Sequence, residues 1–163
     1  RRGAALVVAV DVGYGQLAWE LRQDARVKVL DRTNIRHLTG EQVGEDIDLV
    51  VADLSFISLS LVLPALAAVS KPEADFVLMV KPQFEVGREK LGAGGVVRDP
   101  ALRRSAVLDV AESAYDVGLG TMGIAASPLP GPAGNVEYFL WLRRGAPVID
   151  ESALDRAIEM GPA

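Results

Sequence analysis

The stretch ALVVAVD, residues 5–11, is a valine-rich apolar run that ends at an aspartate. Such an unbroken run is typical of a strand that is buried on both faces of a parallel sheet. The pattern returns at residues 47–52, followed by Asp53, and at residues 75–80, followed by Lys81. Because parallel strands end at the same edge of a sheet, the sequence predicts charged side chains gathered along that edge.

The rest of the chain alternates between extended and helical patterns. Asp99 and Pro100 have the residue types of a helix N-cap and a first helical position. Residues 83–97 are glycine-rich and charged, and a connection of this length often carries function. Further strands are predicted at 27–30, 119–126 and 136–142, and helices at 14–24, 59–69, 100–116 and 151–160. This alternation predicts one α/β domain over residues 1–163 with a largely parallel sheet.

The composition excludes several kinds of site. The 163 residues are 50% hydrophobic and 24% charged, a balance that favours a packed domain over disorder. There is no cysteine, and the single histidine, His37, cannot build a multi-histidine zinc site, so we expect no metal. No apolar run approaches the roughly 20 residues of a membrane span, which favours a cytoplasmic protein. The formal net charge of −5 repels phosphates, so this chain alone should bind nucleic acid weakly.

Four charged residues are candidates for chemistry. Ligands of open α/β sheets bind beyond the carboxyl ends of the strands, where Asp11, Asp53 and Lys81 lie. Glu137 interrupts the last predicted strand on a face that also carries aromatic residues, a costly place for a carboxylate without a cationic partner. We expect Lys81 to be that partner, although a lysine at a strand end can simply extend into solvent.

The turn after the first strand supports three interpretations. Residues 13–18, GYGQLA, match the glycine fingerprint of dinucleotide-binding domains, and Asp31 then favours an NAD-dependent oxidoreductase. Against this, Asp11 would place a carboxylate beside the pyrophosphate. The glycines could also serve only the tight turn. In the third interpretation, Asp11 binds the ribose diol of a cofactor such as S-adenosylmethionine, and Asn34 either lies beside its adenine or is an ordinary turn residue.

Six blocks of sequence carry a family resemblance: VVAVDVGYGQLAW, RTNIR, DLVVADLSFISL, LMVKPQFEVG, GGVVRDP and SPLPGPAGNVEYFLWL. Together they resemble the TlyA family over nearly the entire chain. Members of this family, often named haemolysins, are S-adenosylmethionine-dependent ribosomal RNA 2′-O-methyltransferases related to FtsJ/RrmJ enzymes. The resemblance implies a Rossmann-like methyltransferase sheet, mostly parallel with an antiparallel last strand. It also implies methylation of a cytidine ribose in small- and large-subunit ribosomal RNA.

The resemblance also implies site residues and a longer protein. Of a Lys-Asp-Lys-Glu catalytic tetrad, the last three members match Asp53, Lys81 and Glu137. Asp11 matches an acidic cofactor-binding position, Asn34 the adenine side, and Asp53 also lies by the cofactor. In the family, an S4-like basic RNA-binding domain, the first lysine, the first sheet strand and a glycine-rich cofactor loop precede this region. We therefore expect an N-terminally incomplete methyltransferase domain, which reaches ribosomal RNA or ribosomal subunits mainly through that basic domain.

A membrane-active haemolysin is a third function class, suggested by the common name of the family. Such a protein would need a long apolar span or a basic amphipathic helix. The sequence has neither, and its predicted last helix, at 151–160, is acidic. We therefore expect no membrane partner.

Overall fold

The computed structural model describes residues 3–44 and 46–161. Its strands are β1 (Val7–Val10), β2 (Val27–Leu30), β3 (Ile47–Ala52), β4 (Ser70–Val80), β5 (Leu119–Ala126) and β6 (Tyr138–Arg144). Its α-helices are α1 (Trp19–Arg22), α2 (Gly40–Val43), α3 (Leu63–Ala68), α4 (Pro82–Glu85), α5 (Pro100–Asp116) and α6 (Glu151–Glu159). Short 3-10 turns are η1 (Ile35–His37), η2 (Leu59–Leu61), η3 (Arg88–Lys90), η4 (Ala93–Gly95) and η5 (Pro132–Gly134).

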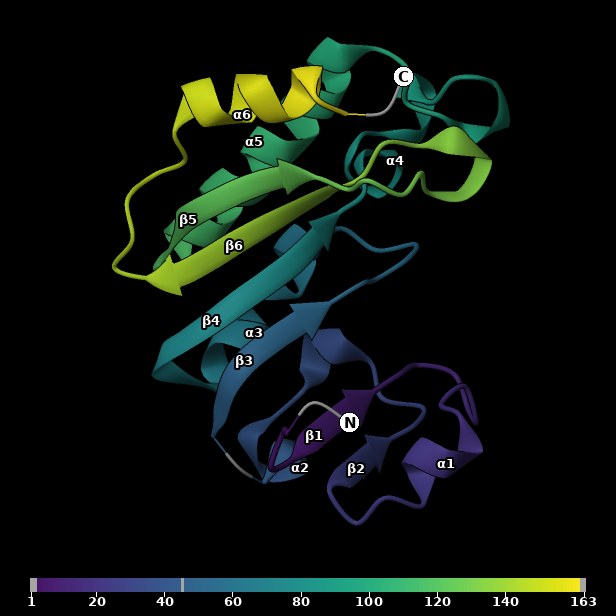
Figure 1. The fold of residues 1–163 in the computed structure, drawn as a ribbon, viewed down its shortest axis with the longest axis vertical. Helices are drawn as coiled ribbons and strands as arrows, with labels where there is room; N and C mark the ends of the chain where they lie inside the picture. Colours follow the sequence, from purple (N-terminus) through teal and green to yellow (C-terminus); the bar gives the residue numbers. More distant parts are fainter. Residues whose placement is uncertain (1–2, 45, 162–163) are drawn as a thin grey trace.

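The described strands form two separate sheets (Figure 1). β1 and β2 form a parallel pair, and the larger sheet has the order β3-β4-β6-β5. β3 is parallel to β4, whereas β6 is antiparallel to both of its neighbours. The prediction of an α/β fold with a mostly parallel arrangement and a reversed last strand is therefore confirmed.

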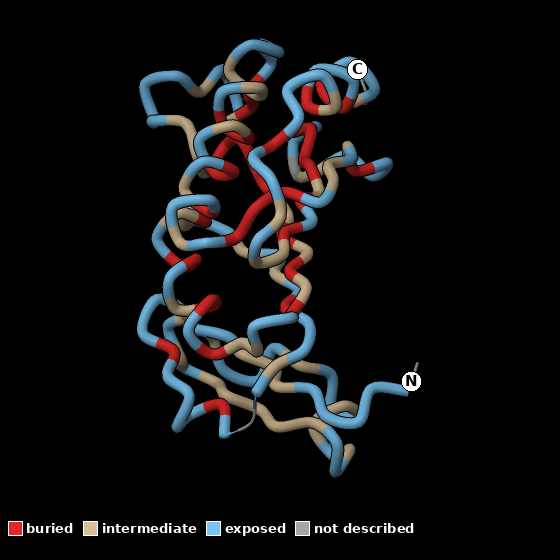
Figure 2. The backbone as a smooth tube through the Cα atoms, turned by 90° about the vertical axis from the view of Figure 1, so that its left-hand side faces the viewer, coloured by how far each residue is buried: buried red, intermediate tan, exposed pale blue. Residues whose placement is uncertain are grey.

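The hydrophobic core lies on one face of the larger sheet. Alternate residues of β4 and β6, among them Phe76, Leu78 and Leu140, are completely buried there. Helices α3, α5 and α6 supply the opposing apolar side chains. Figure 2 shows the buried segments gathered in this part of the molecule, while the chain around β1 and β2 is mostly exposed or half-buried. The packed core thus fixes the ends of β3, β4 and β6 relative to one another.

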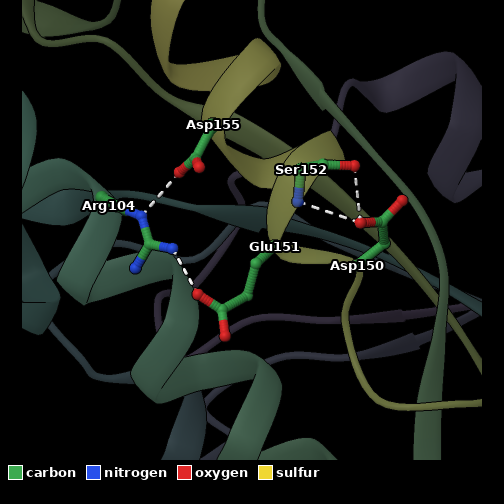
Figure 3. A network of polar contacts seen from close by, with 5 residues as sticks. All are labelled: Arg104, Asp150, Glu151, Ser152 and Asp155. Atoms are coloured by element: carbon green, nitrogen blue, oxygen red, sulfur yellow. Dashed lines mark hydrogen bonds and ion pairs between the residues drawn. The ribbon is translucent and has the colours of Figure 1, made fainter.

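Polar contacts fasten the last helix to this core. Arg104 of α5 donates through Nε to Asp155 and through Nη2 to Glu151, each at 2.6 Å (Figure 3). These two carboxylates of α6 raise the pKa of the Arg104 guanidinium. Asp150 accepts a hydrogen bond from the Ser152 amide and so caps the start of α6. The network holds α5 and α6 together on the outside of the sheet.

A cavity of about 830 Å³ separates β1 from β3. Its walls include Val7, Leu49 and Val51, which come from both strands. Val51 is 73% exposed and Leu49 53% exposed, although both are strand residues with apolar side chains. Among the described residues, no strand pairs with either of the two edges that border this cavity. The sheet is therefore interrupted between β1 and β3.

Several elements differ from the sequence-based predictions. β4 begins at Ser70 rather than at residue 75, and β6 begins at Tyr138, so Glu137 directly precedes this strand and does not interrupt it. The helix expected at 59–69 is divided into η2 and α3, because Pro64 lacks an amide hydrogen and lies in the first turn of α3. The helix expected at 14–24 is reduced to one turn, since Gly15 has a left-handed backbone with φ 71°. The connection at 83–97 begins with the helical turn α4 rather than with irregular structure.

Candidate functional site

Asp53 and Lys81 meet at the carboxyl ends of the neighbouring strands β3 and β4. Lys81 Nζ lies 2.6 Å from Asp53 Oδ1 and donates to Ser55 Oγ at 3.3 Å. The Lys81 side chain is only 10% exposed, whereas that of Asp53 is 69% exposed. A lysine has three N–H donors, and the described residues take two of them. The ammonium is thus held in one direction at the sheet edge, where it can bind an oxygen of a ligand.

Glu137 lies next to Lys81 in the register of the sheet, one residue beyond the pair formed by Val80 and Tyr138. It is 5% exposed, and its Oε1 accepts a hydrogen bond from Gln83 Nε2 at 3.0 Å. The expected ion pair with Lys81 is wrong, because no basic nitrogen in the described part of the chain lies within 4 Å of this carboxylate. Asp53 holds the ammonium instead, and a neutral amide is the partner of Glu137.

Sequence reasoning missed two aromatic residues at the site. Phe56 is 91% exposed and has a left-handed backbone with φ 64°, which is rare for a bulky side chain. Its ring centroid lies 5.0 Å from that of Phe84. Each phenylalanine follows a charged strand end by three residues, Phe56 after Asp53 and Phe84 after Lys81. That repeated spacing is the signal that could have found them.

Sequence reasoning also missed Glu85. Its carboxylate accepts hydrogen bonds from Ser58 Oγ at 2.5 Å and from the Leu59 amide at 2.9 Å. Burial raises the pKa of Glu85 above its ordinary value of 4.5, although both hydrogen bonds act in the opposite direction. Because Glu85 belongs to α4 and its partners follow β3, the contact joins the segments that carry Lys81 and Asp53.

Asp11 and Asn34 lie beyond β1 and β2, in the smaller sheet. Asp11 Oδ1 accepts a hydrogen bond from the Gly13 amide at 2.6 Å. Asn34 Oδ1 accepts one from the Arg36 amide at 3.0 Å and caps η1. Both residues are exposed, so each presents an oriented polar side chain to solvent. The structure thus groups Asp53, Lys81 and Glu137 on one sheet and places Asp11 and Asn34, two of the three predicted cofactor residues, on the other.

The turn after β1 does not suit a dinucleotide. The Asp11 carboxylate already occupies the Gly13 amide, one of the groups that a pyrophosphate would need. Asp31, the expected ribose ligand, is paired with Arg22 at 2.8 Å. α1 has only four residues and begins at Trp19, so it offers no helix N-terminus at the glycines. The NAD interpretation therefore has no structural support.

The described residues form neither a metal-binding cluster nor a helix that could cross a membrane. Within 3–44 and 46–161, no group of three or more His, Asp or Glu side chains is placed to hold a metal ion. No helix in these two ranges combines the length and the apolar character needed to traverse a bilayer. The site is thus built from an ion pair, a buried carboxylate and exposed polar and aromatic side chains.

Comparison with known proteins identifies relatives of this chain. The model of the FtsJ-like methyltransferase family matches residues 1–144. The 16S/23S rRNA (cytidine-2′-O)-methyltransferase TlyA of Mycobacterium tuberculosis is 60% identical over 170 residues. That alignment covers 99% of this chain but 62% of the relative, so the chain spans less than two thirds of the length of TlyA.

Solved structures have the same architecture. A protein named as a hemolysin from Streptococcus thermophilus has a TM-score of 0.91 at 38% identity, with 96% of this chain and 58% of that chain covered. A protein named as an S-adenosylmethionine-dependent methyltransferase from Listeria monocytogenes is 13% identical, with a TM-score of 0.61 over 87% of this chain and 81% of that chain, and shares the fold alone. The chain therefore belongs to the FtsJ-like methyltransferase family, and TlyA is one of the relatives of this chain.

Proposed function

We propose that the chain is the catalytic segment of an S-adenosylmethionine-dependent methyltransferase that modifies the ribose 2′-hydroxyl of a cytidine in ribosomal RNA. The observation that carries this proposal is the Asp53–Lys81 pair, 2.6 Å apart, with the buried Glu137 as its neighbour at the edge of the sheet. The 60% identity to TlyA supports the reaction and the substrate class. A ribosomal RNA substrate also favours a cytoplasmic location.

The exposed residues beyond β1 and β2 fit a nucleoside cofactor. Asp11 Oδ1 is fixed by the Gly13 amide, which leaves Oδ2 as an acceptor for ribose hydroxyls. Asn34 is anchored through Oδ1, and its amide hydrogens can donate to an adenine. S-adenosylmethionine has no phosphate beside its ribose and so avoids repulsion by Asp11. When bound, it supplies an electrophilic methyl group on sulfur, and Asp53, which lines the cavity between β1 and β3, would also lie beside it.

The residues at the ends of β3 and β4 would hold the nucleophile. Lys81 Nζ would bind the ribose 2′-oxygen as an ammonium or, as the neutral amine, would receive the hydroxyl proton, while Asp53 Oδ1 and Ser55 Oγ keep Nζ in one direction. The Glu137 carboxylate, held by Gln83, is a further acceptor beside Lys81. Displacement at a methyl group needs the attacking oxygen, the carbon and the leaving sulfur in line, so we expect positioning to supply most of the rate enhancement.

The exposed ring of Phe56 would support the target base. Stacking of a base on an aromatic side chain contributes about 1–3 kcal/mol. Phe56 is three residues from Asp53, and its ring contacts Phe84, which lies three residues from Lys81. Because strained backbone conformations concentrate at binding sites, the positive φ of Phe56 supports this role.

We further propose that a strand outside the 163 residues completes the sheet between β1 and β3. Such a strand would pair with both unpaired edges and cover Leu49 and Val51, which line the cavity. We assign the first lysine of the tetrad and a glycine-rich cofactor loop to the polypeptide around that strand. An S4-like basic domain beyond it would supply the positive charge that a chain of net charge −5 needs in order to bind RNA.

Calorimetric titration with S-adenosylmethionine tests this proposal. The 163-residue chain is compared with a version extended at its N-terminus by the corresponding segment of TlyA, and transfer of a labelled methyl group to ribosomal RNA is measured for both. We expect cofactor binding and methyl transfer by the extended version. The absence of binding by both versions, when circular dichroism shows that both are folded, would refute the proposal.

A matched pair of lysine variants tests the site itself. Lys81→Met in the extended version should abolish methyl transfer and leave S-adenosylmethionine binding intact. Lys71→Met is the control, because Lys71 forms a similar ion pair with Asp48, at 2.7 Å, near the other end of the same two strands. Equal activity of the two variants would contradict the role of Lys81.

A further inference from the structure

Helix α4 carries two polar side chains that the mechanism above does not place at the reacting atoms. The helix directly follows Lys81 and consists of one turn, with Pro82 at its first position. Gln83 is 9% exposed and Glu85 is half-buried, so neither presents a surface to RNA. Both side chains are engaged by residues distant in sequence. The partner of Gln83 directly precedes β6, and the partners of Glu85 follow β3.

Gln83 orients Glu137. Its Nε2 donates to Glu137 Oε1 at 3.0 Å across 54 residues of sequence. No lysine or arginine nitrogen of the described residues lies within 4 Å of the Glu137 carboxylate. Among these residues, the side-chain amide of Gln83 therefore serves as the donor to this carboxylate. Gln83 Oε1 is buried without a hydrogen-bond partner among the described residues, which has an energetic cost that packing alone does not explain.

Glu85 orients the segment that begins at Asp53. Its two carboxylate oxygens accept hydrogen bonds from Ser58 Oγ and from the Leu59 amide. Ser58 also caps η2, so Glu85 fixes the point at which this segment enters regular structure. The residues between Asp53 and Ser58 include Phe56, whose ring contacts α4 through Phe84. The carboxylate and the aromatic pair therefore hold the same segment against the same helix.

We propose that α4 is a clamp and that Gln83 and Glu85 are positioning residues for methyl transfer. Gln83 sets the direction of the Glu137 carboxylate, and Glu85 sets the place of the Asp53 segment, with Lys81 between them. The inference rests on the proposed methyltransferase function and adds the residues that determine its geometry. Asp53, Lys81 and Glu137 lie at the ends of three different strands, β3, β4 and β6. Helix α4 directly follows β4, and its side chains form hydrogen bonds with the segments at the ends of β3 and β6.

Kinetics of three variants in the extended version test the clamp. Gln83→Met and Glu85→Met keep the approximate size of the side chains but remove the hydrogen bonds. Glu85→Gln is the conservative variant, since its amide can still accept from the Leu59 amide and donate to Ser58 Oγ. The control is Arg104→Met, which removes two 2.6 Å contacts between α5 and α6, away from the site.

A positioning role predicts a loss of kcat with unchanged cofactor binding. We expect kcat to fall at least tenfold in Gln83→Met and Glu85→Met, the Kd for S-adenosylmethionine to stay within twofold, and Glu85→Gln to recover most of the rate. Hydrogen exchange at the Leu59 amide should become faster in Glu85→Met and return to normal in Glu85→Gln. Arg104→Met should lower Tm and leave kcat unchanged.

Two results would overturn the inference. One is a kcat within threefold of the unmodified protein in both methionine variants; the other is a loss of kcat that follows Tm alone, so that Arg104→Met is affected equally. Failure of the proposed function would give a different result: the unmodified extended version would neither bind S-adenosylmethionine nor methylate ribosomal RNA.

Discussion

Replacing Gly131 with alanine should slow methyl transfer while most of the protein stays folded. A Cβ at Gly131 would lie 2.5 Å from Glu137 Oε1, whereas ordinary contacts begin at 3.4 Å. The carboxylate must therefore move by the difference, about 0.9 Å. A misplacement of about 1 Å in an active site can lower the rate roughly 100-fold, which corresponds to about 2.7 kcal/mol in the barrier.

The loss of stability in Gly131→Ala should leave most of the protein folded. The clashing atoms are the end of a flexible side chain, which can rotate away. If this rotation breaks the hydrogen bond from Gln83, the protein loses about 1.5–3 kcal/mol, the usual net contribution of a hydrogen bond to a charged group. A native protein has about 5–15 kcal/mol of stability, so most of the variant should remain folded at the assay temperature.

The assay is the single-turnover rate of labelled methyl transfer by the extended version, with Tm from calorimetry. Gly123→Ala is the matched control, because a Cβ there would meet only the Trp141 ring, at an ordinary distance of 3.7 Å. We expect the control to transfer methyl groups at the unmodified rate. A Gly131→Ala variant that is folded and within threefold of that rate would refute the reasoning that the position of the Glu137 carboxylate matters.

Three further changes have expected outcomes. Phe56→Ala should raise the KM for ribosomal RNA about 5–150-fold, the equivalent of about 1–3 kcal/mol of stacking, with an unchanged Kd for S-adenosylmethionine; an unchanged KM would argue against stacking. Burial raises the pKa of Glu85, so ionisation of this carboxyl opposes folding. The free energy of unfolding of the unmodified protein, relative to that of Glu85→Gln, should therefore decline as the pH rises from below 4.5 through the raised pKa. Urea unfolding at a series of pH values measures this, and a constant difference would contradict it. Gly120→Ala should lower stability by about 3 kcal/mol, because its Cβ would meet the backbone oxygen of Ala146, which cannot rotate away; thermal denaturation with an unchanged Tm would show that the backbone adapts.

The strands and the charged residues at their ends could be predicted from local sequence. A buried parallel strand needs a continuous apolar run, and the residue after the run must lie at the sheet edge. Asp53 and Lys81 follow such runs directly, and the structure places them in contact. The start of β4 was harder to predict, because the strand extends back to Ser70 through polar residues whose pattern does not indicate a buried strand.

The contacts within the site could not be predicted in the same way. Charge alone favoured a pair between Lys81 and Glu137, but the structure gives the ammonium to Asp53 and the carboxylate to Gln83. That outcome depends on the direction in which α4 leaves the end of β4, and the hydrophobic periodicity of the sequence does not predict this direction. The orientation of Phe56 likewise depends on a left-handed backbone angle, and only tertiary contacts can hold a bulky residue there.

The interruption between the two sheets has two effects: it divides the candidate site, and it leaves apolar side chains of β1 and β3 exposed. Asp11 belongs to a pair of strands that contributes little to the main core, whereas Asp53 and Lys81 are held by a packed sheet. In the proposed function, cofactor binding would use the first part and nucleophile positioning the second, and a fixed distance between them would be needed for in-line transfer. In the proposed complete sheet, one strand paired with both edges would fix that distance and cover Leu49 and Val51 at the same time. Completion of the sheet and assembly of the site are then a single step, driven by the burial of apolar surface.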